Sequence, residues 1–187
     1  MHDIKYTIQF LSDWHCGSGL SGGAETDADI IKDEYGIPYV PGKTIKGLLR
    51  YALDEILQVQ PNKVNKSEVE VLFGEGGKLS GAAFFSNASL VEHGDVKDNQ
   101  LAEHLLRNVA STQIDDNGVA VDKSLRVMEV CMPVTLSGII QVPQEDIEQT
   151  ITLLDMAVKW TRAIGLNRNR GLGRCIIQLA KNNNHDN

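Results

Sequence analysis

Cysteine, aromatic residues and long apolar runs are all scarce in this chain. Its three cysteines, Cys16, Cys131 and Cys175, are odd in number, widely spaced and never in a Cys-x-x-Cys pair. This spacing argues against both a disulfide framework and a zinc site. No apolar run approaches the length of a membrane span, and the first residues show no signal-peptide pattern. We therefore expect a protein of the reducing cytoplasm with no membrane partner.

Positive charge is also in short supply, because 18 Lys and Arg residues face 25 Asp and Glu residues, a net charge of −7. Nucleic-acid-binding domains usually have a basic footprint, so this balance argues against one. The distribution weakens that objection, since a basic groove on an acidic body would still bind RNA locally. Scattered, solvated charge is the alternative. The positive residues gather at Lys43, Lys46 and Arg50, at Lys123 and Arg126, and at Arg162, Arg168, Arg170 and Arg174.

Chain length and apolar periodicity predict one α+β domain over residues 1–187. Alternation from Ile4 to Phe10 predicts a strand, and helical spacing predicts helices over about 44–57 and 143–164. Further strands are expected at 81–90 as a central strand, at 125–142 with breaks at Pro133 and Gly138, and at 175–179. This order is the βαββαβ pattern of a ferredoxin-like or RRM-type core with loop insertions.

The expected insertions lie after the first strand, after the first helix and in the middle of the chain. Residues 69–73 are expected to form a short turn packed on the core, and residues 181–187 a polar tail. The stretch over about 92–124 has mixed charge and few strong core residues, so we expect it to project from the body like a thumb. An ordinary loop would have the same composition. Its plausible RNA contacts are Arg107, Gln113, Lys123 and Arg126.

Residues 36–50, with the sequence GIPYVPGKTIKGLLR, contain the most informative pattern. Pro38 and Pro41 hold the backbone extended, and a helix begins after them. Lys43, Lys46 and Arg50 lie beside its apolar face in the first two turns, where free backbone N–H groups favour an anion. The expected ligand is phosphate.

Two better-known phosphate motifs fit this region less well. Gly42-Lys43-Thr44 matches the end of a P-loop, but that motif needs glycine at position 37, where this chain has isoleucine. Residues 17–22 match Gly-x-Gly-x-x-Gly. The residues that follow, 23–33, carry four carboxylates and no helical periodicity, whereas a Rossmann unit needs a helix there.

Three other loops carry residues suited to RNA chemistry. Asp27 and Asp29 lie two apart before the short apolar pair at 30–31, so on an extended chain both carboxylates can face a substrate or a metal ion. His15 beside Trp14 can stack on a base or donate to a phosphate, and a packed tryptophan with a surface histidine is the alternative. A phosphate clamp, or a helix stop with solvated arginines, is expected at Arg168, Arg170, Gly171, Gly173 and Arg174.

These patterns together resemble the RAMP superfamily, the RNA-binding subunits of CRISPR effector complexes. Residues 36–50 are similar to its G-x-P-x-I-P-G-[ST]-[ST]-[IL]-K-G-x-[LI]-R element. The segments DWHCGSG at 13–19 and RGLGR at 170–174 also match. Residues 114–120 and 125–130 resemble the "I-D-R-x-T-G-x-A … L-x-x-x-E" segment of the repeated backbone subunit of type III complexes. The resemblance covers nearly the whole chain, with its motifs in family order.

The resemblance implies a backbone subunit that grips guide RNA and cleaves target RNA. Asp27 matches the cleaving residue, with Asp29 as the alternative register, and a divalent cation such as Mg²⁺ at Asp27 would stabilise the developing charge. Ile114 and Val119 are candidate wedge or hairpin residues of the thumb. Guide contacts are expected from residues 168–174, here called the arginine loop, from His15, Lys123 and Arg126, and from Lys43, Thr44, Lys46 and Arg50.

Other functions stay open at this point. A non-cleaving scaffold or capping subunit would bind RNA and other effector subunits, and self-association into a filament is also compatible with the pattern. A guide-processing endoribonuclease would use His15 as general acid or base, although such enzymes commonly have two ferredoxin-like halves. The sequence does not separate cleavage from scaffolding, and it does not fix the subunit partners or an RNA sequence preference.

Overall fold

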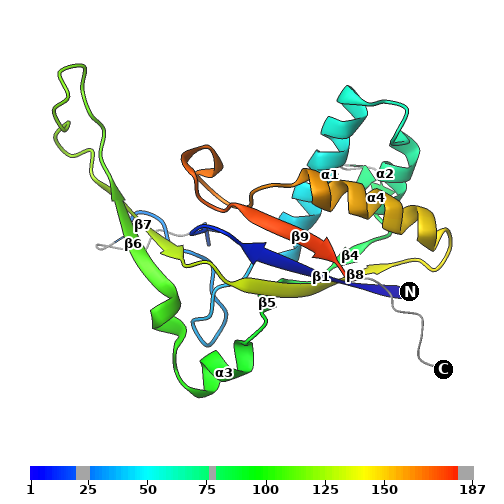
Figure 1. Cartoon of the computed structure of the whole chain (residues 1–187), viewed down its shortest axis with the longest axis horizontal. Coiled ribbons are helices and arrows are strands. Elements are labelled where there is room, and N and C mark those ends of the chain that lie inside the picture. The colour runs from blue at the N-terminus through cyan, green and yellow to red at the C-terminus, as the bar shows by residue number, and fades with distance from the viewer. Residues whose placement is uncertain (20–25, 76–78, 181–187) are drawn as a thin grey trace.

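The core of the molecule is an antiparallel sheet with two helices packed on one face (Figure 1). The computed structural model describes residues 1–19, 26–75 and 79–180. The sheet order is β4-β8-β1-β9, and β5 also pairs with β8. The strands are β1 (His2–Phe10), β4 (Phe84–Phe85), β5 (Ser89–Leu90), β8 (Thr135–Val142) and β9 (Cys175–Leu179). With helices α1 (Gly42–Val59) and α4 (Ile147–Trp160), this order confirms the predicted α+β, ferredoxin-like fold.

Strand β1 is central and buries one face only. Ile4, Tyr6, Ile8 and Phe10 are at most 3% exposed, because side chains alternate across a strand and these four face the helices. The other face of β1 carries the solvent-facing residues Lys5, Thr7 and Gln9. A stacking platform of the RRM type needs aromatic rings at such positions. The solvent face of β1 therefore offers no aromatic stacking platform.

Helix α1 begins where the chain passes closest to the β4–β5 edge. The Gly42 N–H donates to Asn87 Oδ1 (3.0 Å), and Val40 and Ala88 exchange two backbone hydrogen bonds of 3.0 and 2.9 Å. Residues 87–88 thus turn away from β8 to hold the segment that leads into α1. The expected central strand over 81–90 is wrong for this reason, since β4 and β5 form an interrupted edge strand.

Residues 69–73, expected as a turn, belong instead to helix α2 (Lys66–Phe73). Asn65 caps this helix, because its side chain accepts a hydrogen bond from Ser67 N (3.0 Å). The sequence gives only a weak helical signal here, because the buried positions Val69, Leu72 and Phe73 span five residues, about one and a half turns. The strands β2 (Gly74–Glu75) and β3 (Leu79–Ser80) follow as a small separate hairpin.

The break at Pro133 is confirmed, because one strand ends at Cys131 and the next begins at Thr135. Gly138, however, lies inside β8 opposite Tyr6 and causes no break. Helix α4 ends at Trp160, so the buried Ile164 belongs to the following loop, where its N–H donates to Gly173 O (2.9 Å). No helix among the described residues is both long enough and apolar enough to cross a membrane. The expected polar tail at 181–187 lies outside the described residues.

The middle of the chain forms a β-hairpin that extends away from the body (Figure 1). Its strands are β6 (Leu106–Ser111) and β7 (Arg126–Cys131), joined through residues 112–125. Helix α3 (His93–Asp98) and the 3-10 turn η1 (Ala102–Leu105) lead into it. The hairpin starts later and ends later than the projecting stretch expected at about 92–124.

Two glycines of α1 provide an opposed pair of stability tests. A Cβ at Gly42 would lie 2.1 Å from the Phe85 carbonyl oxygen, whereas a Cβ at Gly47 would meet nothing within 4 Å. We expect Gly42→Ala to lower the free energy of unfolding by about 1–3 kcal/mol. Gly47→Ala should raise it by up to about 1 kcal/mol, because alanine favours a helix. Urea denaturation of both variants tests this, and equal stability of the two would contradict the close approach at Gly42.

Candidate functional site

Three loops meet at the end of the sheet from which the β6–β7 hairpin projects. They comprise residues 11–19, 26–33 and 161–174, and all three carry motifs found in the sequence. Trp14 and Cys131 exchange two backbone hydrogen bonds of 2.9 Å, which fixes the first loop to the base of the hairpin. The first loop also accepts bonds from the other two, from Ile31 N to Cys16 O (2.8 Å), from Leu166 N to His15 O (2.9 Å) and from Gly173 N to Asp13 O (2.6 Å).

Glu129 on β7 ties the loops to the hairpin. Its carboxylate, in a side chain 15% exposed, accepts from Ile30 N (3.2 Å) and pairs with Lys32 Nζ (2.8 Å). Its backbone N–H donates to Ala28 O (3.0 Å), and its carbonyl oxygen is 2.6 Å from His15 Nδ1. Sequence reasoning assigned no role to Glu129. The available signal was its place as the final residue of the matched "L-x-x-x-E" segment.

Asp27 is exposed at the junction of the loop and the hairpin. Its Oδ2 accepts from Val127 N (2.8 Å), and its Oδ1 accepts from Arg126 Nη1 (3.2 Å). The Val127 hydrogen bond, with a further contribution from Arg126, holds the pKa of the Asp27 carboxyl below its ordinary value. Asp27 is therefore an ionised hydrogen-bond acceptor at neutral pH. The structure brings together two residues from the sequence prediction, Asp27 and Arg126.

Asp29 has a different environment from Asp27. Its Oδ1 accepts from Thr26 Oγ1, and its carbonyl oxygen accepts from Ser18 N (3.0 Å). The described residues contain no group of three or more His, Cys, Asp or Glu side chains able to hold a metal ion. The surroundings of Asp27 also do not fit a resident cation. The Arg126 guanidinium repels a cation, and the Val127 N–H already occupies a carboxylate oxygen that would have to bind it.

The expectation that His15 contacts RNA is corrected by its burial. The side chain is 0% exposed, with Nδ1 directed at the Glu129 carbonyl oxygen. Nε2 is buried and has no hydrogen-bond partner among the described residues. Trp14 is also 0% exposed and stacks on Phe10 with ring centroids 4.5 Å apart. His15 therefore positions the loops and cannot stack on a base in this conformation, and its neighbour Trp14 is the packed tryptophan of the alternative interpretation.

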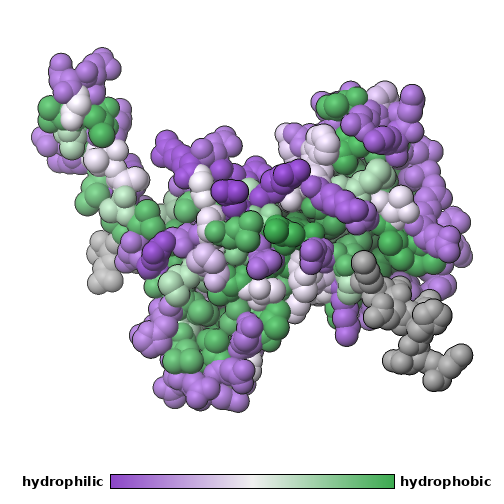
Figure 2. All heavy atoms as spheres, in the orientation of Figure 1, coloured by the Kyte–Doolittle hydropathy of each residue, from purple (hydrophilic) through white to green (hydrophobic). Residues whose placement is uncertain are grey.

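The arginine loop is shaped by its second glycine. Gly173 has φ +70°, and a Cβ there would lie 1.9 Å from the Ile164 carbonyl oxygen. Gly171 has φ +90° but open space around it, so its backbone conformation alone requires glycine. Arg168, Arg170 and Arg174 are exposed, and Figure 2 shows a hydrophilic surface over this loop. Arg168 also lines a cavity of about 350 Å³ together with Tyr51 and Trp160.

The basic residues of α1 lie apart from the arginine loop. Lys43 is exposed, Lys46 Nζ donates to Ala83 O (3.3 Å), and Arg50 Nε is 3.9 Å from Asp54 Oδ2. The side of α1 that faces Arg168 carries Leu48, Tyr51, Ala52 and Glu55 instead. Thr44, which is half-buried, precedes Leu48 by about one turn on that side. The predicted RNA contacts thus divide into a row on α1 and a group around the three loops.

The hairpin tip presents apolar side chains to solvent, and Figure 2 shows apolar atoms at its far end. Asp115 shapes the tip, because its Oδ1 accepts from Asn117 N and Val119 N (2.9 Å each), which lowers the pKa of its carboxyl. Lys123 lies near the tip, whereas Arg107 pairs with the buried Asp13 at the base. The tip residues more than 35% exposed include Ile114, Val119, Val121 and Leu125.

The environment of Asp27 can be tested by titration. Arg126→Gln removes a hydrogen bond and a positive charge from the ionised carboxylate, so we expect the pKa of Asp27 to rise toward its ordinary value. The Val127 N–H still bonds to the carboxylate, so part of the lowering should persist. A ¹³C NMR titration of the side-chain carboxyl measures this, with Lys123→Gln as the control. An unchanged Asp27 pKa in Arg126→Gln would contradict the pairing.

The role of Glu129 can be tested by hydrogen exchange. Glu129→Ala leaves the Ile30 N–H without its acceptor, so we expect that amide to exchange at least about tenfold faster, corresponding to about 1.4 kcal/mol. The amides of Ile8 and Ile140 in the central strands should be affected less. Glu103→Ala, at an exposed position of η1, serves as control. Equal exchange at Ile30 in all forms would show that the carboxylate does not hold the loop.

Comparison with known proteins identifies a family and solved structures of similar fold. The model of the RAMP superfamily matches residues 7–176. No curated protein sequence matches this chain significantly. Two cryo-EM structures of the type III-B Cmr-beta complex contain chains of similar fold. One is bound to cognate target RNA (TM-score 0.73, 12% identity, 96% of this chain and 97% of that chain). The other is the apo state (TM-score 0.72, 12% identity, 96% and 98%). Because the family model spans most of its length, the protein belongs to the RAMP superfamily.

Proposed function

We propose that this protein is an RNA-binding backbone subunit of a type III CRISPR ribonucleoprotein, and that it cleaves target RNA with the help of Asp27. The observation that carries the proposal is the exposed, ionised Asp27 carboxylate, held at the base of a projecting hairpin and beside a loop bonded to the arginine loop. Membership of the RAMP superfamily and the fold shared with Cmr-beta chains support the RNA-binding part. RNA and other effector subunits are the partners in this proposal.

The chemistry would be attack of a target-RNA 2′-hydroxyl on the adjacent phosphate. With its pKa lowered, Asp27 is a weak base, so its contribution is to accept the hydrogen bond of the 2′-hydroxyl and orient the oxygen for in-line attack. The bond from the 2′-oxygen to phosphorus forms as the bond to the 5′-oxygen of the next nucleotide breaks. The hydroxyl proton leaves to solvent, and the departing 5′-oxygen takes a proton from solvent, so a 2′,3′-cyclic phosphate and a free 5′-hydroxyl result. Such a site would be slow and would depend on the RNA being splayed into place.

The hairpin tip would provide that splaying. Ile114 and Val119, 62% and 61% exposed, suit insertion between stacked nucleotides of a guide–target duplex. Lys43, Lys46 and Arg50 on α1, with the exposed arginines at 168–174, would contact the phosphates of the guide.

A divalent cation enters this proposal only with the RNA. The described side chains form no cation cage near Asp27. Any Mg²⁺ that cleavage requires would therefore be carried by the RNA phosphates, as is common for this hard cation, which retains most of its water.

A non-cleaving scaffold is the second candidate, and one observation favours it. Both carboxylate oxygens of Asp27 already accept hydrogen bonds, so a 2′-hydroxyl would share Oδ1 with Arg126 or compete with it. In that case the subunit would bind RNA and neighbouring subunits without cutting. Guide processing through His15 is not proposed, because the imidazole is buried.

Cleavage of a guide–target pair by the assembled complex, purified with its partners, tests the proposal. We expect regularly spaced target cuts, with Asp27→Ala lowering the cleavage rate at least about 100-fold while RNA binding stays within about twofold. Asp29→Ala, the matched neighbour, should retain the cuts. EDTA shows whether a divalent cation is needed.

Binding is measured separately from cleavage. Lys43→Ala should weaken RNA binding and reduce the slope of log affinity against log salt by about one. Unchanged cuts in Asp27→Ala would eliminate the catalytic role and leave the scaffold. No binding by wild-type complex under any salt condition would eliminate both candidates.

A further inference from the structure

One edge of the main sheet is covered by another segment of the chain, and the other edge is open. At the β4–β5 edge, Val40 and Ala88 exchange two backbone hydrogen bonds, so the segment before α1 covers that edge. At the other end of the strand order lies β9, whose outer side adjoins a groove of about 760 Å³. Natural proteins usually cover, shorten or charge an edge strand, because its unpaired backbone groups recruit other strands. The open β9 edge is therefore a candidate docking surface.

The hydrogen-bond register of β9 identifies which backbone groups are free. Ala180 N donates to Lys5 O (2.7 Å) and Leu11 N donates to Arg174 O (2.7 Å), so even-numbered residues of β9 bond to β1. The backbone groups of Ile177 and Leu179 consequently point outward. Among the described residues they have no backbone partner. Within the described part of the chain, the outward N–H of Cys175 is the one that is used, since it donates to Arg162 O (3.0 Å).

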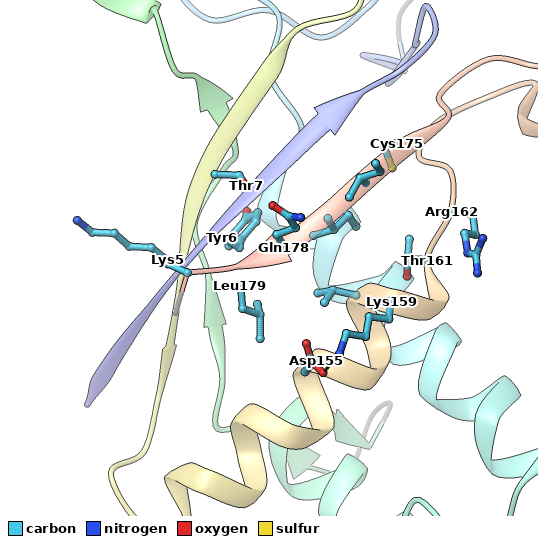
Figure 3. A pocket seen from close by; sticks show the side chains of 14 residues that line it. Lys5, Tyr6, Thr7, Asp155, Lys159, Thr161, Arg162, Cys175, Gln178 and Leu179 are labelled. Carbon is cyan, nitrogen blue, oxygen red and sulfur yellow. Dashed lines mark hydrogen bonds and ion pairs between the residues drawn. The ribbon is translucent and has the colours of Figure 1, made fainter. Parts of the chain in front are cut away.

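The groove beside this edge has an apolar wall and basic ends (Figure 3). Val158 of α4 lines it together with Ile177 and Leu179, whose side chains face the helix side of the sheet. Lys5 and Arg162 lie at opposite ends of β9 (Figure 3), and neither has an ion-pair partner among the described residues. The one acid of the lining, Asp155, is paired with Lys159 (2.6 Å). The unpaired charges of the groove are thus positive.

We propose that this groove receives an extended segment of a partner protein, added to the sheet as a strand beside β9. Outward N–H and C=O groups two residues apart match the repeat of a strand, about 6.6–6.8 Å, and this match selects a polypeptide over RNA. Alternate side chains of the added strand pack against the half-buried Leu179 and the adjoining surface of α4. A carboxylate near one end of the segment pairs with Arg162 on the helix face of the sheet, and a carboxylate near the other end pairs with Lys5 on the opposite face. This inference does not depend on Asp27 or on RNA cleavage.

The test uses a fluorescent eight-residue peptide of alternating valine and threonine with glutamate at both ends, added to the full-length protein. The even length places the two glutamates on opposite faces of the added strand, as Lys5 and Arg162 require. Two isomers carry backbone N-methyl groups, one on odd and one on even central positions. An added strand directs only one set of N–H groups toward β9, so one isomer should lose at least about tenfold in affinity and the other less than about twofold. Fluorescence anisotropy measures both.

Charge reversal supplies the second arm of the test. Lys5→Glu combined with Arg162→Glu should weaken the acidic peptide and restore binding to a peptide with lysine at both ends. Lys63→Glu, on an exposed turn after α1, is the matched control and should change the affinity of neither the acidic nor the lysine-ended peptide. Circular dichroism confirms that each variant is folded.

Several outcomes would overturn the proposal. They are equal effects of the two methylated isomers, no binding of the parent peptide at millimolar concentration, and displacement of the peptide by a short single-stranded RNA. Peptide binding that appears only after removal of residues 181–187 would assign the groove to the chain's own end and not to a partner.

Discussion

The carboxylate of Glu129 lies under the loop of residues 26–33 with little access to water, and a charge in that position must be paired and hydrogen-bonded. The Ile30 N–H and the Lys32 ammonium group satisfy it, and in doing so they fix the loop. The main chain of the same residue holds Ala28 and the His15 ring. Glu129 thus connects the loop that carries Asp27, the buried His15 ring and the base of the hairpin.

Periodicity was enough to predict most of the fold. The alternation from Ile4 to Phe10 and the apolar face of α1 are strong local signals, and burial on one side of each follows from them. The predicted strands are wrong at the points where contacts between distant segments determine the backbone conformation. Asn87 and Ala88 leave the ladder to hold the start of α1, so the strand over 81–90 lies at an edge. Gly138 resembles a break in sequence, but its missing side chain makes room for the buried Tyr6 ring inside β8.

The site could be predicted in its parts but not in its assembly. Asp27 and Arg126 were identified separately, and their pairing required the hairpin to return beside the loop, which no local pattern encodes. His15 was misassigned because burial depends on three segments that lie far apart in the sequence. Glu129 was overlooked because a carboxylate that organises backbone looks, in sequence, like any other acid on a strand. The sequence does not show how the basic row of α1 lies relative to the arginine loop, and the structure places Leu48, Tyr51 and Glu55, not the basic row, beside Arg168.

Asp27 is attached to the projecting hairpin more directly than to the sheet. Its backbone N–H and its carboxylate both bond to Val127, and Arg126 holds the other carboxylate oxygen. Asp27 and the apolar tip therefore belong to the two ends of one element: the carboxylate lies where the hairpin leaves the body, and the tip lies at its far end. The direction in which the hairpin leaves the body consequently fixes where the tip stands relative to the carboxylate.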